Sequence, residues 1–482
     1  MTGDFRRIYL IGICGTAMAT LAAMLKRKGF DVRGSDQDVY PPMSDFLASE
    51  GIAAQSGYTA DHITSDIDFV VVGNAISRGN AELEEVLDRK IRYGSLPEAI
   101  RDHFLWGARS IVIAGTHGKT TTTSLTGWLL THGGVDPSVL VGGVALNFGD
   151  GGSSYRIGGG RDFVIEGDEY DSAYFDKTAK FLKYLPDIAV VNNVEFDHAD
   201  IYADFEAVAL AFRRLVNLVP RKGLLLVGAD SPGARAVAEK AHSRVETFGT
   251  GNPDSAGSDV LTWQAHDIAA TGSTTKFRVR RKGLPFADFE MPLLGLHNVR
   301  NALAAIAVAT EAGIGVERIG EGLRAFAGIK RRLEVVGTAR GVTVYDDFAH
   351  HPTAVAETLA GLRASHPSAR IWAVFEPRSA SSCRRVFQDD FAKAFSAADE
   401  IVLAPVFRST LPEPLRLSIP DLIRDLQGQG KAARAPASLD EIVSVIVRER
   451  RDGDLVIMMS NGGFGGIHKK LLLALSEAEG RG

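Results

Sequence analysis

The chain has 482 residues, of which 45% are hydrophobic and 23% charged, a composition typical of a soluble globular protein. It is too long for one hydrophobic core, so we expect two or three domains. The net charge of −5 argues against nucleic acid as a main partner, because a phosphate backbone requires a basic surface. The two cysteines, Cys14 and Cys383, form no CxxC motif and no disulfide framework, which suits a reducing compartment.

The first hundred residues alternate short apolar runs with helical patterns. An apolar stretch over residues 8–25 follows two arginines and superficially resembles a signal peptide or a membrane span. Gly12 and Gly15 interrupt it where a strand would turn into a helix over 16–28, and a second strand begins at Phe30, as a βαβ unit requires. We therefore expect a parallel sheet, no membrane insertion and a cytoplasmic location.

A second unit begins at Ser110, where the apolar strand SIVIAG leads into GTHGKTTTT and a helix over 119–131. This is the context of a phosphate-binding loop, in which glycines let backbone N–H groups face the phosphates. Lys119 is expected to hold the β- and γ-phosphates from a surface loop, and the Thr120 hydroxyl to bind Mg²⁺. The loop is shortened, because Ile113 stands where the common GxxxxGK[ST] pattern has its first glycine.

Two further groups follow strands of the same unit. Glu166 ends the strand 163–166, and His198 comes soon after the strand 188–192. The carboxyl ends of parallel strands face the ligand crevice, so these side chains are candidates for holding a metal, Mg²⁺ or Mn²⁺, beside the γ-phosphate. The acidic neighbours of Glu166 are interpreted as solvated or structural residues: Asp168, Glu169 and Asp171.

A third unit begins after Arg332, where the strand of GVTVYDDFAHHP leads into a helix from about Thr353. Three more strands, each followed by a loop, lie in RIWAVFEPR, EIVLAP and DLVIMMSNGG. Ahead of this unit, residues 298–312 read as a helix and 249–258 as a surface loop. We predict an α/β protein of three domains in series: a Rossmann-like domain over 1–107, a P-loop ATPase-like domain over 108–327 and a Rossmann-like domain over 328–482.

Six motifs in this order resemble the Mur ligases: GTHGKTT, E-x-D-E, N-x-E-x-D-H, GLHNVRN from Gly295, KRRLE from Lys330 and YDDFAHHPT from Tyr345. That family forms amide bonds in peptidoglycan precursors by way of an acyl phosphate. The resemblance implies one domain for a UDP-sugar, one for ATP and one for the incoming amino acid or peptide.

The resemblance also implies roles for residues. The expected ATP-binding residues are Gly115, Thr116, His117, Gly118, Lys119, Thr120, Thr121, His297, Asn298, Asn301, Arg332 and Asp346. Among these, His297, Asn298 and Asn301 would recognise adenine, Arg332 would reach the γ-phosphate when the third domain closes, and Asp346 would contact the ribose. The expected metal ligands are Thr120, Glu166 and His198, and the expected catalytic residues are Lys119, His198, Arg332 and His350. His350 or His351 is expected to accept the proton of the amine.

The resemblance has two further implications, one for a lysine position in the middle domain and one for the UDP-sugar contacts. Some family members carry a carbamylated lysine about fifteen residues after the metal-binding histidine, and a gapless count from His198 reaches Arg213.

The glycine turn near the N-terminus resembles a UDP-binding loop. Its expected UDP-sugar contacts are Gly12, Ile13, Cys14, Gly15, Ser35, Asp36 and Asn74.

Two branches of the family share UDP-N-acetylmuramate as acceptor: one adds L-alanine in de novo synthesis, and the other adds the recycled murein tripeptide L-alanyl-γ-D-glutamyl-meso-diaminopimelate. Several strings resemble the recycling branch, among them SDQDVYPPMS, GNAISRGN, FEPRSASS and MSNGGFGGIHKKLL. The predicted function is ATP-dependent tripeptide ligation, with L-alanine ligation as the alternative. Arg378, Ser460 and Asn461 are the expected peptide contacts. A folate- or cyanophycin-type ligase would lack the UDP-type fold that the first hundred residues predict.

Overall fold

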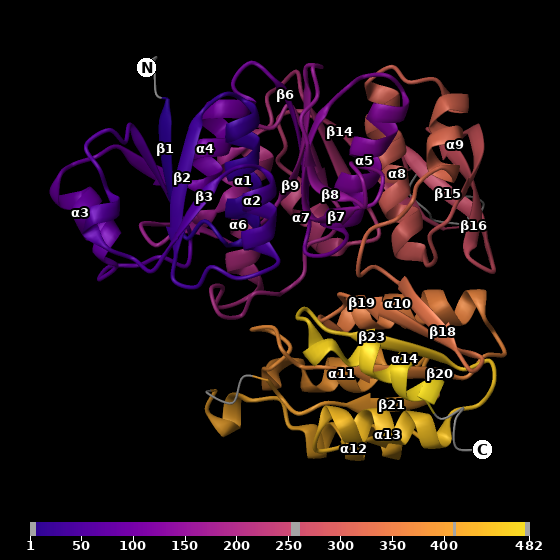
Figure 1. The fold of residues 1–482 in the computed structure, drawn as a ribbon. Helices are drawn as coiled ribbons and strands as arrows, with labels where there is room; N and C mark the ends of the chain where they lie inside the picture. Colours follow the sequence, from indigo (N-terminus) through magenta and orange to yellow (C-terminus); the bar gives the residue numbers. More distant parts are fainter. Residues whose placement is uncertain (1–5, 252–260, 408–410, 478–482) are drawn as a thin grey trace.

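The computed structural model describes residues 6–251, 261–407 and 411–477. Three α/β domains follow one another along the chain, each built on its own sheet (Figure 1). The N-terminal and middle domains lie side by side, and the C-terminal domain packs below them in this view. The predicted three-domain α/β fold is confirmed. No helix in the described part of the chain is long and apolar enough to cross a membrane.

The N-terminal domain has a five-stranded parallel sheet in the order β3-β2-β1-β4-β5. Its strands are β1 (Arg7–Ile11), β2 (Asp31–Asp36), β3 (Ala53–Ser56), β4 (Phe69–Val72) and β5 (Tyr93–Ser95). Its helices are α1 (Thr16–Arg27), α2 (Met43–Ser49), α3 (Ala81–Asp88) and α4 (Leu96–Ile100). The helix predicted over 16–28 is therefore α1, and the apolar stretch that resembles a membrane span is a buried strand, a glycine turn and a core helix.

The middle domain has a ten-stranded sheet in the order β17-β16-β15-β14-β13-β12-β6-β9-β7-β8. Its strands are β6 (Arg109–Ala114), β7 (Ser138–Ala145), β8 (Ser153–Arg156), β9 (Asp162–Gly167), β12 (Ile188–Val191), β13 (Leu224–Gly228), β14 (Arg244–Thr250), β15 (Trp263–Thr271), β16 (Thr274–Arg281) and β17 (Leu284–Met291), with a separate pair β10 (Asp171–Ala173) and β11 (Asp176–Ala179). Its helices are α5 (Lys119–His132), α6 (Phe205–Leu218), α7 (Pro232–Ala238), α8 (Leu296–Glu311) and α9 (Val316–Arg324). The central strands are parallel, and β12 and β13 are apolar throughout, as strands covered on both faces are.

One edge of this sheet differs from a purely parallel P-loop sheet. Strands β15, β16 and β17 form an antiparallel meander. The turn between β16 and β17 consists of Lys282 and Gly283, and both have positive φ, 52° and 79°, as a tight two-residue hairpin requires. The surface loop predicted over 249–258 lies mostly outside the described residues, and β14 extends to Thr250.

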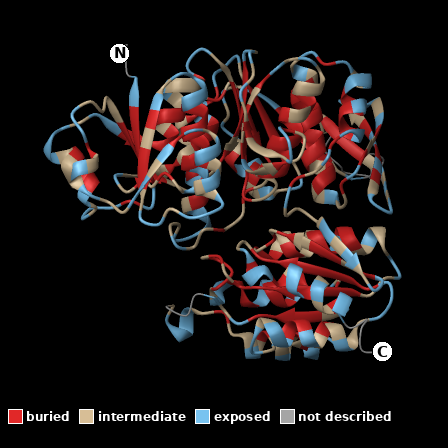
Figure 2. Cartoon of the chain, in the orientation of Figure 1, coloured by how far each residue is buried: buried red, intermediate tan, exposed pale blue. Residues whose placement is uncertain are grey.

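The C-terminal domain has a six-stranded sheet in the order β18-β19-β23-β20-β21-β22, in which only the pair β18–β19 is antiparallel. Its strands are β18 (Glu334–Ala339), β19 (Val342–Asp347), β20 (Ile371–Phe375), β21 (Glu400–Leu403), β22 (Ala432–Arg434) and β23 (Leu455–Met459). Its helices are α10 (Pro352–Ser365), α11 (Gln388–Ala394), α12 (Ile419–Gly428), α13 (Leu439–Glu449) and α14 (Ile467–Glu477). Figure 2 shows that buried residues fill the sheets of all three domains. The predicted boundaries near 107 and 328 lie between these sheets and stay predictions.

Candidate active site

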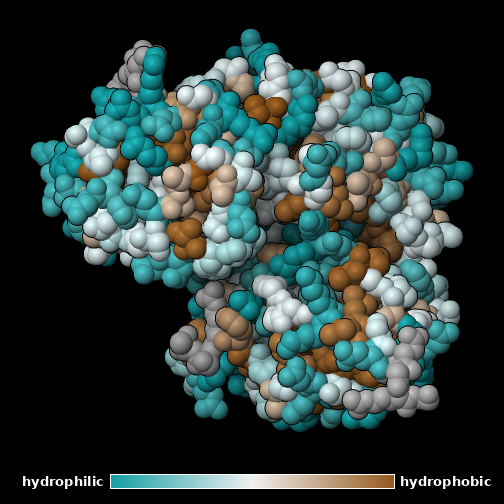
Figure 3. Space-filling model, in the orientation of Figure 1, coloured by the Kyte–Doolittle hydropathy of each residue, from teal (hydrophilic) through white to brown (hydrophobic). Residues whose placement is uncertain are grey.

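A cleft of about 850 Å³ lies where the three domains meet, and residues of all three line it. The space-filling view shows the molecule hollowed between its upper part and the C-terminal domain (Figure 3). Of the residues predicted to bind ATP, all line this cleft except Gly115 and Asp346. The metal candidates Glu166 and His198 line it as well, as does His350.

The phosphate loop joins β6 to α5, and its shape depends on two glycines. Gly115 and Gly118 have φ of 139° and 79°, in the region that side chains disfavour. A Cβ on Gly118 would also lie 2.4 Å from Asn301 Oδ1, and one on Gly115 would lie 2.9 Å from Asn192 Cβ. Substitution at either position would therefore displace the loop.

Lys119 does not lie in an exposed loop, so that expectation is wrong. Its Nζ donates to Glu169 Oε2 at 2.8 Å and to the Gly115 carbonyl at 2.8 Å. The side chain of Lys119 is 12% exposed and that of Glu169 only 1%. Burial lowers the pKa of Lys119, but the charges of Glu169 and Asp168 outweigh burial and raise it overall. Lys119 thus stays a cation, and a phosphate would compete with Glu169 for it.

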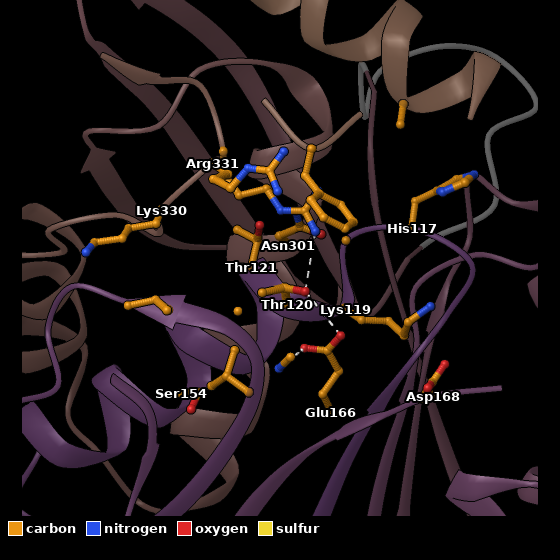
Figure 4. A pocket seen from close by; sticks show the side chains of 18 of the residues that line it. His117, Lys119, Thr120, Thr121, Ser154, Glu166, Asp168, Asn301, Lys330 and Arg331 are labelled. Carbon is orange, nitrogen blue, oxygen red and sulfur yellow. Dashed lines mark hydrogen bonds between the residues drawn. The ribbon is translucent and has the colours of Figure 1, made fainter. Parts of the chain in front are cut away.

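The predicted metal ligands Thr120 and Glu166 lie together (Figure 4). The Thr120 hydroxyl donates to Glu166 Oε1 at 3.1 Å, and the Gly142 N–H donates to Glu166 Oε2 at 2.7 Å. Burial raises the pKa of Glu166 despite the opposing charge of Lys119. A cation beside Glu166 would relieve this cost. Carboxylate and hydroxyl groups suit Mg²⁺ or Mn²⁺, so Thr120 and Glu166 fit the metal that the sequence predicts, whereas His198, the third predicted ligand, clusters with Asp168 and Glu169 instead.

His198 pairs with a carboxylate that the sequence analysis treated as structural or solvated. Its Nε2 lies 3.3 Å from Glu169 Oε1. Burial opposes the charged imidazole, but Glu169 and Asp197 outweigh it and raise the pKa of His198 to about 9. The ligand atoms of Asp168, Glu169 and His198 all lie within 4.8 Å of one another. Glu169 is therefore not solvated but is a buried partner of both Lys119 and His198, and its position just after β9 was a usable signal.

The three residues predicted to recognise adenine lie at the start of α8, and they differ in the hydrogen bonds that they make. Asn301 Oδ1 accepts from the Thr122 hydroxyl at 3.0 Å, and its Nδ2 donates to Asn298 Oδ1 at 3.1 Å. The Asn298 amide donates to the Leu294 carbonyl at 2.7 Å. His297 Nδ1 is buried without a hydrogen-bond partner. Asn301 therefore anchors the phosphate-loop helix, and His297 is the group open to a base.

The C-terminal domain reaches the phosphate loop through Arg332, whose Nη2 lies 3.4 Å from Thr120 Oγ1. The ribose contact predicted at Asp346 needs correction, because Asp346 does not line the cleft and instead binds Arg331 Nε at 3.2 Å. Neighbouring residues of a strand face opposite sides. Asp347 is therefore the acid that faces the cleft, where its carboxylate accepts from the Leu333 and Ala349 N–H groups.

The two histidines proposed as bases differ in their free atoms. His350 Nδ1 lies 2.9 Å from the Phe348 carbonyl, to which it donates, so its Nε2 is free to accept a proton in the cleft. His351 Nε2 lies 3.2 Å from the Phe196 carbonyl, and its Nδ1 accepts from the Thr353 N–H at 3.3 Å. Burial lowers the pKa of both, that of His351 to about 4. Both ring nitrogens of His351 thus take part in hydrogen bonds, whereas His350 uses its Nδ1.

The N-terminal glycine turn does not present its N–H groups to a ligand, contrary to expectation. The Gly12 and Ile13 N–H groups donate to the Ser35 carbonyl at 2.9 Å, the Cys14 N–H to Asp36 Oδ2 at 2.8 Å, and the Gly15 N–H to the Gly12 carbonyl at 3.2 Å. Ser35 is fully buried, with its hydroxyl 2.5 Å from Glu82. Asn74 is exposed outside the cleft. The residues of this domain that line the cleft are Thr16, Ala17, Thr20, Met43, Phe46, Leu96 and Ile100.

The expected peptide contacts cluster in the C-terminal domain. The Arg378 guanidinium lies over the Phe407 ring at 3.7 Å, and its Nη1 lies 3.7 Å from Glu376 Oε1. Ser460 is buried and donates to Glu376 Oε2 at 2.5 Å, so it is not a free donor. Asn461 Oδ1 is buried without a hydrogen-bond partner.

The gapless count to Arg213 does not identify a site residue. The Arg213 side chain is 42% exposed on α6, pairs with Glu206 at 3.1 Å, and does not line the cleft.

A phosphate loop, an acidic group beside it and an arginine from a separate domain together define an enzyme of ATP-dependent phosphoryl transfer. Family models match the chain in three segments: Mur ligase family, catalytic domain, over 7–105; Mur ligase middle domain over 113–309; and Mur ligase, glutamate ligase domain, over 331–462. The chain belongs to the Mur ligase family, and it is a ligase.

Three relatives illustrate the similarity. The UDP-N-acetylmuramate–L-alanyl-γ-D-glutamyl-meso-2,6-diaminoheptandioate ligase of Haemophilus influenzae is 39% identical over 97% of this chain and 98% of its own length. The UDP-N-acetylmuramate–L-alanine ligase of Salinibacter ruber is 37% identical over 84% and 81%. The crystal structure of a murein peptide ligase from Psychrobacter arcticus matches with a TM-score of 0.69 and 36% identity, covering 98% and 99%.

Proposed function

We propose that this protein joins L-alanyl-γ-D-glutamyl-meso-diaminopimelate to UDP-N-acetylmuramate with hydrolysis of ATP to ADP and phosphate. The observation that carries the proposal is 39% identity, over nearly the whole of both chains, to a relative named for that reaction. The proposed domain limits are 1–107 for the UDP-sugar, 108–327 for ATP and 328–482 for the peptide.

The first step is phosphorylation of the muramate carboxylate. A carboxylate oxygen attacks the γ-phosphorus and ADP leaves, so an acyl phosphate forms. Lys119 and Arg332 supply positive charge on two sides of the transferring group, Lys119 after leaving Glu169. Thr120, Glu166 and His198 would hold Mg²⁺, with Glu169 beside them, and the ion would neutralise phosphate charge. His297 Nδ1 would meet the adenine, and Asp347 the ribose.

The second step is attack of the peptide amine on the acyl carbon, with release of phosphate. The amine must lose a proton, and His350 Nε2 is the free acceptor in the cleft. Arg378 and Asn461 are proposed to meet polar groups of the peptide. UDP contacts are assigned to the start of α1, where Thr16 and Ala17 line the cleft, because the glycine turn before it uses its own N–H groups.

The test measures ADP release and product mass with ATP, Mg²⁺, UDP-N-acetylmuramate and tripeptide, each omitted in turn. The proposal predicts ADP only when all are present, and a product equal in mass to the two substrates minus water. ADP release without an amine, or with no joined product, would refute ligation. The second candidate is L-alanine as the amine, which the Salinibacter ruber relative favours.

A further inference from the structure

A second cluster of side chains that could hold a metal ion lies between the middle and C-terminal domains, and of its members His117 also lines the ATP cleft. It consists of His117 from the phosphate loop, Glu195 from the loop after β12 and His351 at the start of α10. Glu195 Oε2 lies 3.2 Å from His117 Nε2 and 3.8 Å from His351 Nδ1. Ligand atoms about 2 Å from one ion lie about 3.3 Å apart in a tetrahedral site, so small movements would complete this geometry.

The hydrogen bonds of His351 leave Nδ1, the ring nitrogen nearer to Glu195, without a proton. Its Nε2 lies 3.2 Å from the Phe196 carbonyl oxygen, which can only accept, so the ring proton is on Nε2. Nδ1 therefore directs a lone pair toward Glu195, although in this structure it accepts weakly from the Thr353 N–H at 3.3 Å. A metal-binding histidine commonly donates its second N–H to a backbone carbonyl in this way.

The cluster is also open to an incoming ion. Glu195 and His351 line a groove of about 440 Å³ beside α11, separate from the ATP cleft. The Glu195 side chain is 35% exposed, whereas those of His117 and His351 are 13% and 6% exposed. The site thus combines two held imidazoles with an accessible carboxylate.

We propose that His117, Glu195 and His351 form a binding site for a transition-metal ion of the Zn²⁺ class, including Co²⁺ and Ni²⁺. Two imidazoles and one carboxylate favour these ions over Mg²⁺, which prefers oxygen ligands and retains its waters. The ion would join the phosphate loop to the first turn of α10. It would therefore hold the C-terminal domain against the middle domain.

The test titrates the full-length protein with Co²⁺ in excess Mg²⁺ and follows visible absorption, then displaces Co²⁺ with Zn²⁺. We expect one Co²⁺ bound at this site and a Zn²⁺-dependent rise in thermal midpoint. Glu195→Gln and His117→Gln should each weaken Co²⁺ binding at least about tenfold. His351→Asn should do the same, and asparagine can still cap α10. Circular dichroism shows whether each variant folds.

The matched control is His198→Gln, which removes the imidazole of the other cluster, Asp168, Glu169 and His198. This variant should keep the Co²⁺ absorption of the proposed site. The proposal is overturned if no Co²⁺ binds in excess Mg²⁺, or if folded Glu195→Gln and His117→Gln bind it as tightly as the wild type. Loss of the signal only in His198→Gln would also overturn it. None of these results depends on the ligase reaction.

Discussion

Gly462→Ala should displace the Arg378 side chain without removing the positive charge of this arginine from the protein. A Cβ at residue 462 would lie 2.2 Å from Arg378 Nε and 2.4 Å from its Cδ, so the arginine would have to move off Phe407. Gly462 has no positive φ, and its backbone therefore accepts alanine. The neighbouring Gly463 has φ of −74°, and its Cβ would meet nothing within 4 Å. Gly463→Ala is thus a matched control.

The magnitude follows from the contact that Arg378 is proposed to make with a peptide carboxylate. A charge-assisted hydrogen bond contributes about 1.5–3 kcal/mol. Its loss from the transition state should lower kcat/KM for the tripeptide about 10- to 150-fold. Arg378→Ala should have a similar effect. Activity with L-alanine, which lacks the distal carboxylates, should fall less in both variants.

The assay measures initial rates of ADP release at saturating ATP and UDP-N-acetylmuramate, with the tripeptide varied. Thermal midpoints of both alanine variants are measured in parallel, and both should stay near the wild-type value. Equal kcat/KM for Gly462→Ala and Gly463→Ala would refute the role of Arg378. A large loss in Gly463→Ala would show that the glycine loop acts through its flexibility instead.

Substitutions at three further positions, one of them also combined with Glu169→Gln, test the site. Lys119→Ala should abolish ADP release and also lower the free energy of unfolding, because the buried Glu169 then keeps only His198 as a cationic partner. Adding Glu169→Gln should restore part of the stability in denaturant but not turnover, and near-normal turnover in Lys119→Ala would remove the loop from the mechanism. His198→Ala should lower kcat far more than ATP affinity, whereas weaker ATP binding at unchanged kcat would make His198 structural. His351 has a pKa lowered to about 4, below its unfolded value of ~6.5, so its contribution to stability is present above pH ~6.5 and is lost as pH falls toward 4. His351→Asn should therefore lose less unfolding free energy than the wild type over this range, and equal losses would contradict the assignment.

The sequence predicted the elements that carry strong periodic patterns. The glycine-to-helix transitions at α1 and α5 were placed correctly, because an apolar strand, a glycine turn and a helix follow in order. The antiparallel meander of β15–β17 was missed, although β16 alternates buried and exposed residues, which is the pattern of a half-buried strand. Local pattern therefore identified the parallel core better than the edge of the sheet.

The site was predicted less completely, because motifs do not report which side-chain atoms are already bonded. Asp346 and Asp347 are adjacent in sequence, yet strand alternation places only Asp347 in the cleft. The sequence left open whether Glu169 is structural or solvated, and the structure shows it buried and paired with Lys119. The turn at Gly12 looked like a phosphate cradle, but its N–H groups bond within the protein. These distinctions depend on tertiary contacts.

The central claim is that the incoming amine is the tripeptide. The most direct measurement compares kcat/KM for the tripeptide and for L-alanine with one enzyme preparation, saturating ATP and UDP-N-acetylmuramate, and mass spectrometry of each product. We predict a preference for the tripeptide of ~10-fold or more, since even one charge-assisted hydrogen bond in the transition state supplies that ratio. Equal or greater efficiency with L-alanine would contradict the claim and would assign the chain to the alanine-adding reaction.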